Sequence, residues 1–485
     1  MLFNSYIFIF LFFPLVLLGY YGLNYIKKEK LSLFFLLGMS FWFYGYSNLY
    51  YLILLIISIC VNFGLTFAME RKPNFKKALM MAGVFYNLGV LGYFKYFDFF
   101  LDNINRLFKT EIPFLKVALP IGISFFTFQQ ISYVVDFYHG ECERYSFLEY
   151  ANYVSFFPQL IAGPIVYHTE LIPQFRDSAK KRFNPRNMSK GMYAFALGLG
   201  KKVLIADVFS KIVNIGYGDI ENLNSISAIL VILCYTLQIY FDFSGYSDMA
   251  IGLGLMCNIE LPINFNSPYK SASIGEFWNR WHITLNRFLT KYVYIPLGGN
   301  RKGMLKTCIN VMIVFLLSGL WHGANWTFVC WGAINGFGIV VNKLLGNKRE
   351  KLPSVLRKIG CFGFVSISWV MFRASSIGEA ITLMKRIFIG GTGTLAGAFC
   401  DAFNGLIEMK ALYRLGFGMV IDQIPWMFLT CFLLLVLYFV FFRKNTQEKI
   451  QAMKFSFGEN LLTVFLLFYS IMSLSEMSEF LYYNF

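Results

Sequence analysis

The segment from residue 307 to residue 342, TCINVMIVFLLSGLWHGANWTFVCWGAINGFGIVVN, contains no Asp, Glu, Lys or Arg. A membrane helix needs about 20 predominantly apolar residues, so this segment is long enough for a hairpin of two such helices. Gly319 and Gly323 permit a turn near its middle, and Lys306 and Lys343 flank it. We therefore expect a first helix that rises from a basic loop and a second helix that returns to the same side of the membrane.

This hairpin is expected to place His322 at membrane depth. From Thr307 to Leu320 a helix would be about 21 Å long, which is less than the roughly 30 Å of hydrocarbon in a bilayer. An ionisable side chain at that depth is a functional candidate by default. Imidazole suits a general base because its pKa, about 6.5, lies near working pH. A neutral histidine that packs by a hydrogen bond is the alternative interpretation.

Uncharged blocks recur along the chain, which is 57% hydrophobic and only 14% charged. Soluble domains carry about 25% charged residues, so the composition indicates a membrane protein. Residues 31–69 form a second block that is long enough for a hairpin. We expect an all-α polytopic membrane protein with about ten to twelve embedded helices, and a single integral domain over residues 1–485. Shorter uncharged blocks lie at 1–26, 78–94, 117–135, 222–241, 423–442 and 460–475.

The 43 Lys and Arg residues, against 27 Asp and Glu, are concentrated in short loops. Such a distribution is typical of loops that face an anionic cytoplasmic leaflet, so it argues against nucleic-acid binding. The loop 270–306 is therefore expected in the cytoplasm and residues 374–422 outside. The first apolar block has no basic residue before it and is followed by Lys27 and Lys28, so it is not expected to be a cleaved signal peptide.

Two stretches depart from the hairpin pattern. Within 141–220, the segment FFPQLIAGPIVY (156–167) is apolar but interrupted by Pro and Gly, so we expect it to be re-entrant or buried among helices. Residues 242–306 join two membrane segments and contain EFWNRWHITLNRFLTKY (276–292), which predicts an amphipathic helix at the membrane interface. Asn279, His282 and Asn286 would form a polar seam on that helix. Its apolar stripe would consist of Trp278, Trp281, Leu285, Phe288 and Leu289.

The remaining ionisable candidates have ordinary structural interpretations. His139 and His168 lie next to apparent loops and are expected to be structural. Asp136, Asp242 and Asp248 each end an apolar run, where capping or salt bridging is at least as plausible as ion coupling in a transporter. No Cys or His spacing suits zinc, so no metal site is expected.

Three motifs in order, FWNRWHITL (277–285), YIPLGG (294–299) and SGLWHGANW (318–326), carry a family resemblance. Together they resemble the membrane-bound O-acyltransferase family, and more narrowly its bacterial alginate O-acetyltransferase branch. The segments SFFTFQQISYVVD (124–136) and QIYFDFSGYSDMAIGLG (238–254) are similar to the same branch.

The resemblance implies that His322 is the catalytic histidine and that His282 accompanies it. It also implies a ring of tilted and re-entrant helices around a thin centre in the bacterial cytoplasmic membrane. The donor would be acetyl-CoA or another acyl thioester from the cytoplasm, with no permanently bound cofactor. The acceptor would be extracytoplasmic, and polysaccharide O-acetylation is expected, completed by a separate extracytoplasmic esterase-like protein.

Arg280, Arg301 and Lys302 are candidates for binding the phosphates of coenzyme A, because guanidinium groups bind phosphate in bidentate fashion. Positive-inside topology explains the same charges without a ligand. Acyl transfer to teichoic acid, peptidoglycan, lipid or protein remains an alternative within the family. A transporter or flippase is the alternative from another class, but the sequence shows no paired inverted repeats.

Overall fold

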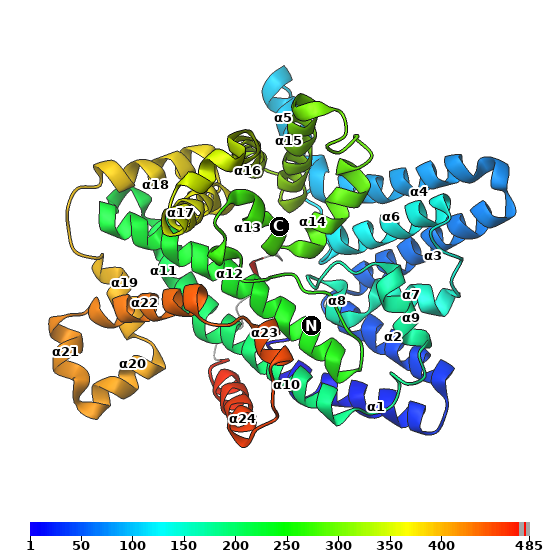
Figure 1. The fold of residues 1–485 in the computed structure, drawn as a ribbon, viewed down its shortest axis with the longest axis horizontal. Coiled ribbons are helices and arrows are strands. Elements are labelled where there is room, and N and C mark those ends of the chain that lie inside the picture. The colour runs from blue at the N-terminus through cyan, green and yellow to red at the C-terminus, as the bar shows by residue number, and fades with distance from the viewer. Residues whose placement is uncertain (475–479, 482–485) are drawn as a thin grey trace.

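A computed structural model describes residues 1–474 and 480–481, which form helices joined by loops (Figure 1). Among these residues no β-strand occurs, and Phe265 and Trp281 form an isolated antiparallel bridge. The predicted all-α polytopic class is confirmed.

The helices of the first half are α1 (Phe13–Tyr25), α2 (Glu29–Gly45), α3 (Leu49–Arg71), α4 (Lys76–Leu91), α5 (Phe97–Phe108), α6 (Ile123–His139), α7 (Phe147–Ser155), α8 (Phe157–Leu160), α9 (His168–Arg176), α10 (Pro185–Gly200), α11 (Asp207–Gly218) and α12 (Ser225–Met256). Those of the second half are α13 (Ile274–Arg280), α14 (Ile283–Leu289), α15 (Gly303–His322), α16 (Trp326–Leu345), α17 (Ser354–Arg373), α18 (Ile377–Ile389), α19 (Gly397–Asn404), α20 (Ile407–Leu412), α21 (Gly418–Gln423), α22 (Met427–Phe442), α23 (Thr446–Gln451) and α24 (Phe457–Met472).

Seven helices in the described part of the chain are long and apolar enough to cross a membrane, or eight if one bent pair is a single span. The estimate of ten to twelve embedded helices also counted shorter apolar segments, which form helices such as α6 and α24. The candidate spans are Phe8–Tyr25, Leu49–Arg71, Pro73–Phe108, Ser225–Met256, Gly303–His322, Trp326–Leu345 and Ser354–Arg373, and the bent pair is Ile407–Gln423 with Met427–Phe442.

Both predicted hairpins form, as α2 with α3 and as α15 with α16. In the second hairpin the helices approach closely because glycines face the neighbouring backbone. A Cβ atom on Gly319 would lie 2.3 Å from the carbonyl oxygen of Phe328, and one on Gly332 would lie 2.4 Å from that of Phe315. Small residues allow this spacing, as they do in other membrane helix pairs.

α12 crosses the middle of the molecule (Figure 1) and continues well beyond the predicted apolar block 222–241. The expectation that residues from 242 onward begin a connecting segment is therefore wrong, because the helix extends to Met256. Asp242 and Asp248 are tolerated inside it since Lys202 and Lys201 pair with them, at 2.7 and 2.6 Å. Salt bridging, one of the two structural roles expected for these acids, is what the structure shows.

The segment FFPQLIAGPIVY was expected to be either re-entrant or buried among helices, and the structure shows that it is buried. Residues 156–166 are all buried, with α8 as the only helix within them. Next to it, α10 packs against α12 through paired glycines. A Cβ atom on Gly198 would lie 2.6 Å from the carbonyl oxygen of Gly245, so this contact requires glycine. The result is a tightly packed interior around α12.

The Lys202–Asp242 pair provides a test of this interior. Each side chain is only 2% exposed, and a second carboxylate, Asp207, lies 2.9 Å from the Lys202 ammonium group. We expect Asp242→Asn to destabilise the protein by about 3 kcal/mol, because it leaves a buried charge poorly compensated. Thermal unfolding in detergent measures the change. Asp207→Asn is the control, and we expect a smaller loss of stability there because the Asp207 carboxylate is 21% exposed. An equal or larger loss in Asp207→Asn would show that Asp242 is not the main partner of Lys202.

Candidate active site

His322 is the last residue of α15, and it is only 3% exposed. Its ring contacts those of Trp321, Trp331 and Phe372, with centroids 4.9, 5.2 and 5.0 Å away. The helix ends here because the next residue, Gly323, is extended, with φ −166° and ψ 148°. The imidazole therefore lies at a chain turn, among aromatic rings and in an environment of low polarity.

The length predicted for this helix is wrong. α15 begins at Gly303 rather than Thr307 and has 20 residues, which corresponds to about 30 Å. Lys306 does not stop the helix, because a lysine near a helix end can extend its amino group toward the polar interface. The depth of His322 in the membrane stays a prediction, since it no longer follows from a short helix.

The expected continuous helix over 276–292 is also corrected by the structure. α13 ends at Arg280 and α14 begins at Ile283, with His282 between them at φ 46° and ψ 52°. Backbone pairing replaces the helical bonds at this point. The Ile283 amide donates to the Asn264 carbonyl at 3.0 Å, and the Asn266 amide donates to the Arg280 carbonyl at 2.9 Å.

His282 consequently leaves the predicted polar seam. The two other members of the seam, Asn279 and Asn286, remain in contact. The side-chain nitrogen of Asn286 lies 3.4 Å from the side-chain oxygen of Asn279. His282 Nδ1 instead lies 3.3 Å from the side-chain oxygen of Asn264, and its ring packs on Phe243 at 4.8 Å. The predicted apolar stripe is buried throughout, with Trp278, Trp281, Leu285, Phe288 and Leu289 all in the core.

The structure brings His282 and His322 together, with ring centroids 6.4 Å apart. Trp321 contacts both rings, at 5.9 and 4.9 Å. His282 lies outside the candidate spans, and burial lowers its pKa to about 3, so this imidazole is neutral near pH 7. Within the described residues no group of three or more His, Cys, Asp or Glu side chains is arranged to hold a metal ion.

Lys95 supports the His322 turn, and the sequence analysis did not identify it. Its amino group donates to the Trp321 carbonyl at 2.5 Å and lies 3.3 Å from the His322 carbonyl. The neighbouring Tyr96 hydroxyl donates to the Leu320 carbonyl at 2.9 Å. These donors satisfy carbonyl groups that a helix end leaves without partners. A lysine directly after the apolar block 78–94 was the available signal.

Arg280, Arg301 and Lys302 do not form a contiguous cluster through direct contacts. Arg280 pairs with Glu276 at 3.0 Å and donates to the Asn266 carbonyl at 3.2 Å. Arg301 and Lys302 are exposed in the loop before α15. In the described part of the chain no hydrogen bond or ion pair joins Arg280 to either of them. Their role at the donor entrance stays a prediction.

Asp136 and His168 belong to a separate buried network. Asp136 Oδ2 lies 3.0 Å from His168 Nε2, and Lys291 and Tyr292 also hold the carboxylate, at 3.0 and 2.9 Å. Tyr145 lies 2.9 Å from the other ring nitrogen of His168. The network joins α6 and α9 to the segment after α14, and therefore fixes the chain on one side of His282. His139 is exposed.

Comparisons with known proteins identify the family of the chain. The membrane-bound O-acyltransferase family model matches residues 112–378, which include both histidines. The peptidoglycan O-acetyltransferase of Helicobacter pylori is 39% identical, over 100% of this chain and 98% of its own length. The probable alginate O-acetylase AlgI of Pseudomonas aeruginosa is also 39% identical, over 82% of this chain and 76% of its own. The teichoic acid D-alanyltransferase of Streptococcus thermophilus is 25% identical over half of the chain and 60% of its own length. The chain therefore belongs to the membrane-bound O-acyltransferase family, as a multi-pass membrane enzyme that transfers acyl groups.

Proposed function

We propose that this enzyme moves an acetyl group from a cytoplasmic thioester to an extracytoplasmic hydroxyl acceptor, across the bacterial cytoplasmic membrane, and that this step serves the O-acetylation of a cell-envelope polysaccharide. The observation that carries the proposal is the buried pair His282 and His322, 6.4 Å apart at two chain breaks within the family region. Histidine is the side chain best suited to accept a proton from a hydroxyl group near neutral pH.

In this mechanism His322 is the general base. It removes the proton from the acceptor hydroxyl while that oxygen attacks the carbonyl carbon of the thioester. The carbon–sulfur bond then breaks, and the thiolate receives the proton from the His322 imidazolium. The products are an O-acetyl ester and a free thiol, so no oxidant, reductant or metal is consumed.

The residues around the pair have distinct parts in the mechanism. Trp331 and Phe372 exclude water from the His322 ring, which favours transfer to the acceptor over hydrolysis of the thioester. Lys95 donates to the Trp321 and His322 carbonyl groups at the end of α15 and so positions His322. His282, whose Nδ1 lies beside Asn264, is the neutral companion that orients one of the reacting groups.

Peptidoglycan is the proposed acceptor, because the Helicobacter pylori peptidoglycan enzyme aligns over the whole chain. An alginate-like exopolysaccharide is the second candidate, since the alginate O-acetylases reach the same identity over 82% of the chain. In either case we propose that a separate extracytoplasmic esterase-like protein completes the transfer to the polymer. Acetyl-CoA is the proposed donor.

The central test replaces His322 with alanine. We expect acetyl transfer to fall roughly 10²–10⁴-fold, the contribution of a positioned general base. Release of acetate from purified cell-wall polymer by mild base measures transfer in cells, and acetyl-CoA consumption measures it in purified protein. His139→Ala, at an exposed histidine, is the matched control with no expected loss. Retention of most activity by a folded His322→Ala enzyme would contradict the catalytic role.

Lys95 offers a test of positioning. Lys95→Met removes the donor to the Trp321 and His322 carbonyls but leaves a side chain of similar length. We expect kcat to fall about 10–100-fold with little change in KM for acetyl-CoA, because the general base loses its alignment. Partial rescue by Lys95→Arg is expected, since a donor returns. A rise in KM at unchanged kcat would instead place Lys95 in donor binding.

Substitutions that change the charge of Arg280, Arg301 and Lys302 test whether these residues form the entrance for the donor. Reversing Arg301 to Glu replaces attraction by repulsion for the phosphates of coenzyme A, so we expect a higher KM for acetyl-CoA. The effect should grow at low ionic strength, where screening is weakest. Lys358→Glu, at an exposed basic residue of α17, is the control. An unchanged acetyl-CoA titration when Arg280, Arg301 and Lys302 are all neutralised would remove this cluster from the donor site.

A further inference from the structure

A cavity of about 360 Å³ lies where the end of α22 and the middle of α24 meet α10 and α12. One part of its wall is apolar and includes residues of the two apolar helices α22 and α24, namely Phe439, Val440, Leu462 and Leu466. The other part is basic and comes mainly from the loop after α22. We call this cavity the basic pocket, and its basic residues are Lys201, Arg443, Lys444 and Lys449.

The positive charge of the basic pocket is not balanced within the protein. Lys201 is neutralised by Asp248 at 2.6 Å, and the same carboxylate oxygen accepts a hydrogen bond from Thr446 at 2.6 Å. Arg443, Lys444 and Lys449 form no ion pair with any residue in the described ranges 1–474 and 480–481. Three cations therefore converge on one cavity without an acidic partner.

Lys449 shows the consequence of this imbalance. Burial lowers its pKa, and the positive charges of Lys201 and Arg443 lower it further, while Asp248 acts in the opposite direction. Like charges held close together in a partly buried site raise the free energy of the empty protein. An anion bound among them would relieve that repulsion.

The ligand must also match the apolar wall. Leu462 and Leu466 lie in the middle of α24, and Val440 belongs to the last turn of α22, so the pocket joins an apolar surface to a basic loop. A free phosphate ion would leave this apolar part unfilled, whereas an amphipathic anion fills both. Basic pockets between membrane helices on the cytoplasmic side are a recurrent form of lipid headgroup site.

We propose that the basic pocket binds the phosphate headgroup of an anionic glycerophospholipid, with its acyl chains along the end of α22 and the middle of α24. This site lies beyond the proposed acyl transfer and does not depend on it. The bound lipid would attach the segment 443–456, which contains α23, to the cytoplasmic leaflet.

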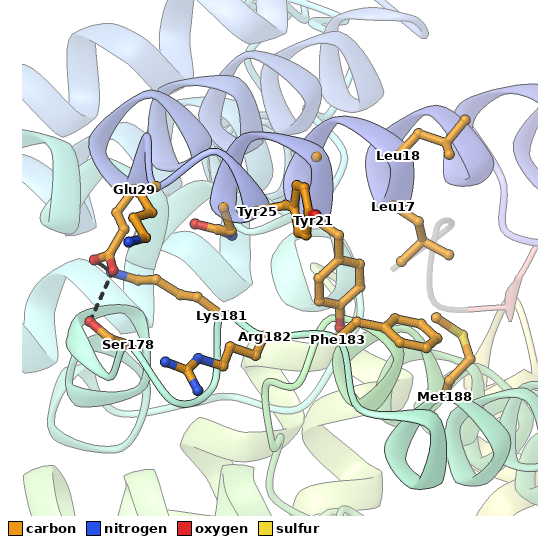
Figure 2. Close-up of a pocket in the computed structure, with 13 residues that line it drawn as sticks. Leu17, Leu18, Tyr21, Tyr25, Glu29, Ser178, Lys181, Arg182, Phe183 and Met188 are labelled. Carbon is orange, nitrogen blue, oxygen red and sulfur yellow. Dashed lines mark hydrogen bonds and ion pairs between the residues drawn. The ribbon is translucent and has the colours of Figure 1, made fainter.

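A second cleft, at the end of α1, provides the comparison (Figure 2). Its volume is about 870 Å³, and its lining includes Lys27, Lys181 and Arg182. Figure 2 shows Lys181 directed at Glu29, with which it pairs at 2.7 Å, and Ser178 also bonds that carboxylate. An internal acid therefore neutralises the most buried cation of this cleft. A charge change at Arg182 is a matched control for each single substitution in the basic pocket, because it removes one positive charge at another basic cleft.

The test uses the full-length protein, purified in a neutral detergent and titrated with phosphatidylglycerol or phosphatidylcholine while thermal unfolding is followed. We expect phosphatidylglycerol to raise Tm more than phosphatidylcholine does. Each basic residue near a membrane surface contributes roughly fivefold to the affinity for anionic lipid, so Lys444→Gln with Lys449→Gln should weaken it about 25-fold. Lys449→Arg should retain the affinity, and Arg182→Gln should leave it unchanged.

Three outcomes would overturn the proposal. The first is an unchanged phosphatidylglycerol titration in the double variant, and the second is an equal loss in Arg182→Gln, which would indicate a general charge effect. The third is displacement of bound phosphatidylglycerol by coenzyme A, which would assign the basic pocket to the donor. If the double variant does not fold, Lys444→Gln alone gives the same comparison, because Lys444 is exposed.

Discussion

A helix that ends inside a protein leaves carbonyl groups without partners, and the end of α15 depends on how these groups are satisfied. Lys95 and Tyr96 reach them from a π-helical turn, Gly92–Tyr96, within a long composite helix. Such turns are frequent at functional sites because they displace side chains from the regular helical register. Without these donors α15 would have no stable end at His322, and the imidazole would lose its fixed position.

The same requirement shapes the chain around His282. There the helix breaks because the strand-like segment that contains Phe265 pairs with Trp281 and supplies the backbone partners. His282 adopts a positive φ of 46°, which is uncommon for a residue other than glycine and persists only where the surroundings fix it. Both histidines therefore lie where helices stop. Packing between the surrounding helices is tight at Gly198 and Gly319, where a Cβ atom would collide with the neighbouring backbone.

Local patterns in the sequence predicted much of this arrangement. Uncharged blocks in the sequence located the hairpins, and the apolar run around His322 indicated that this side chain is buried. Both signals arise because a segment inside a membrane must lack charged residues. The break at His282 could not be predicted, since it results from pairing with Asn264 and Asn266, which no periodicity reveals. The length of α12 was missed for a similar reason. A charged residue ends an uncharged block, so Asp242 ended the predicted span. In the structure the helix continues because Lys202, on another helix, neutralises Asp242.

Charge compensation separates the interior of the molecule from its basic edge. In the interior, Lys202 has two carboxylate partners, Asp207 and Asp242. Such matching is required where water is absent, because an unpaired buried charge costs several kcal/mol. At the edge, Lys449 faces other cations instead. Among the described residues Lys95 has no acidic partner either, but its amino group is satisfied by the Trp321 and His322 carbonyls. An anion from the lipid leaflet would supply at the edge the charge compensation that the chain itself provides for Lys202.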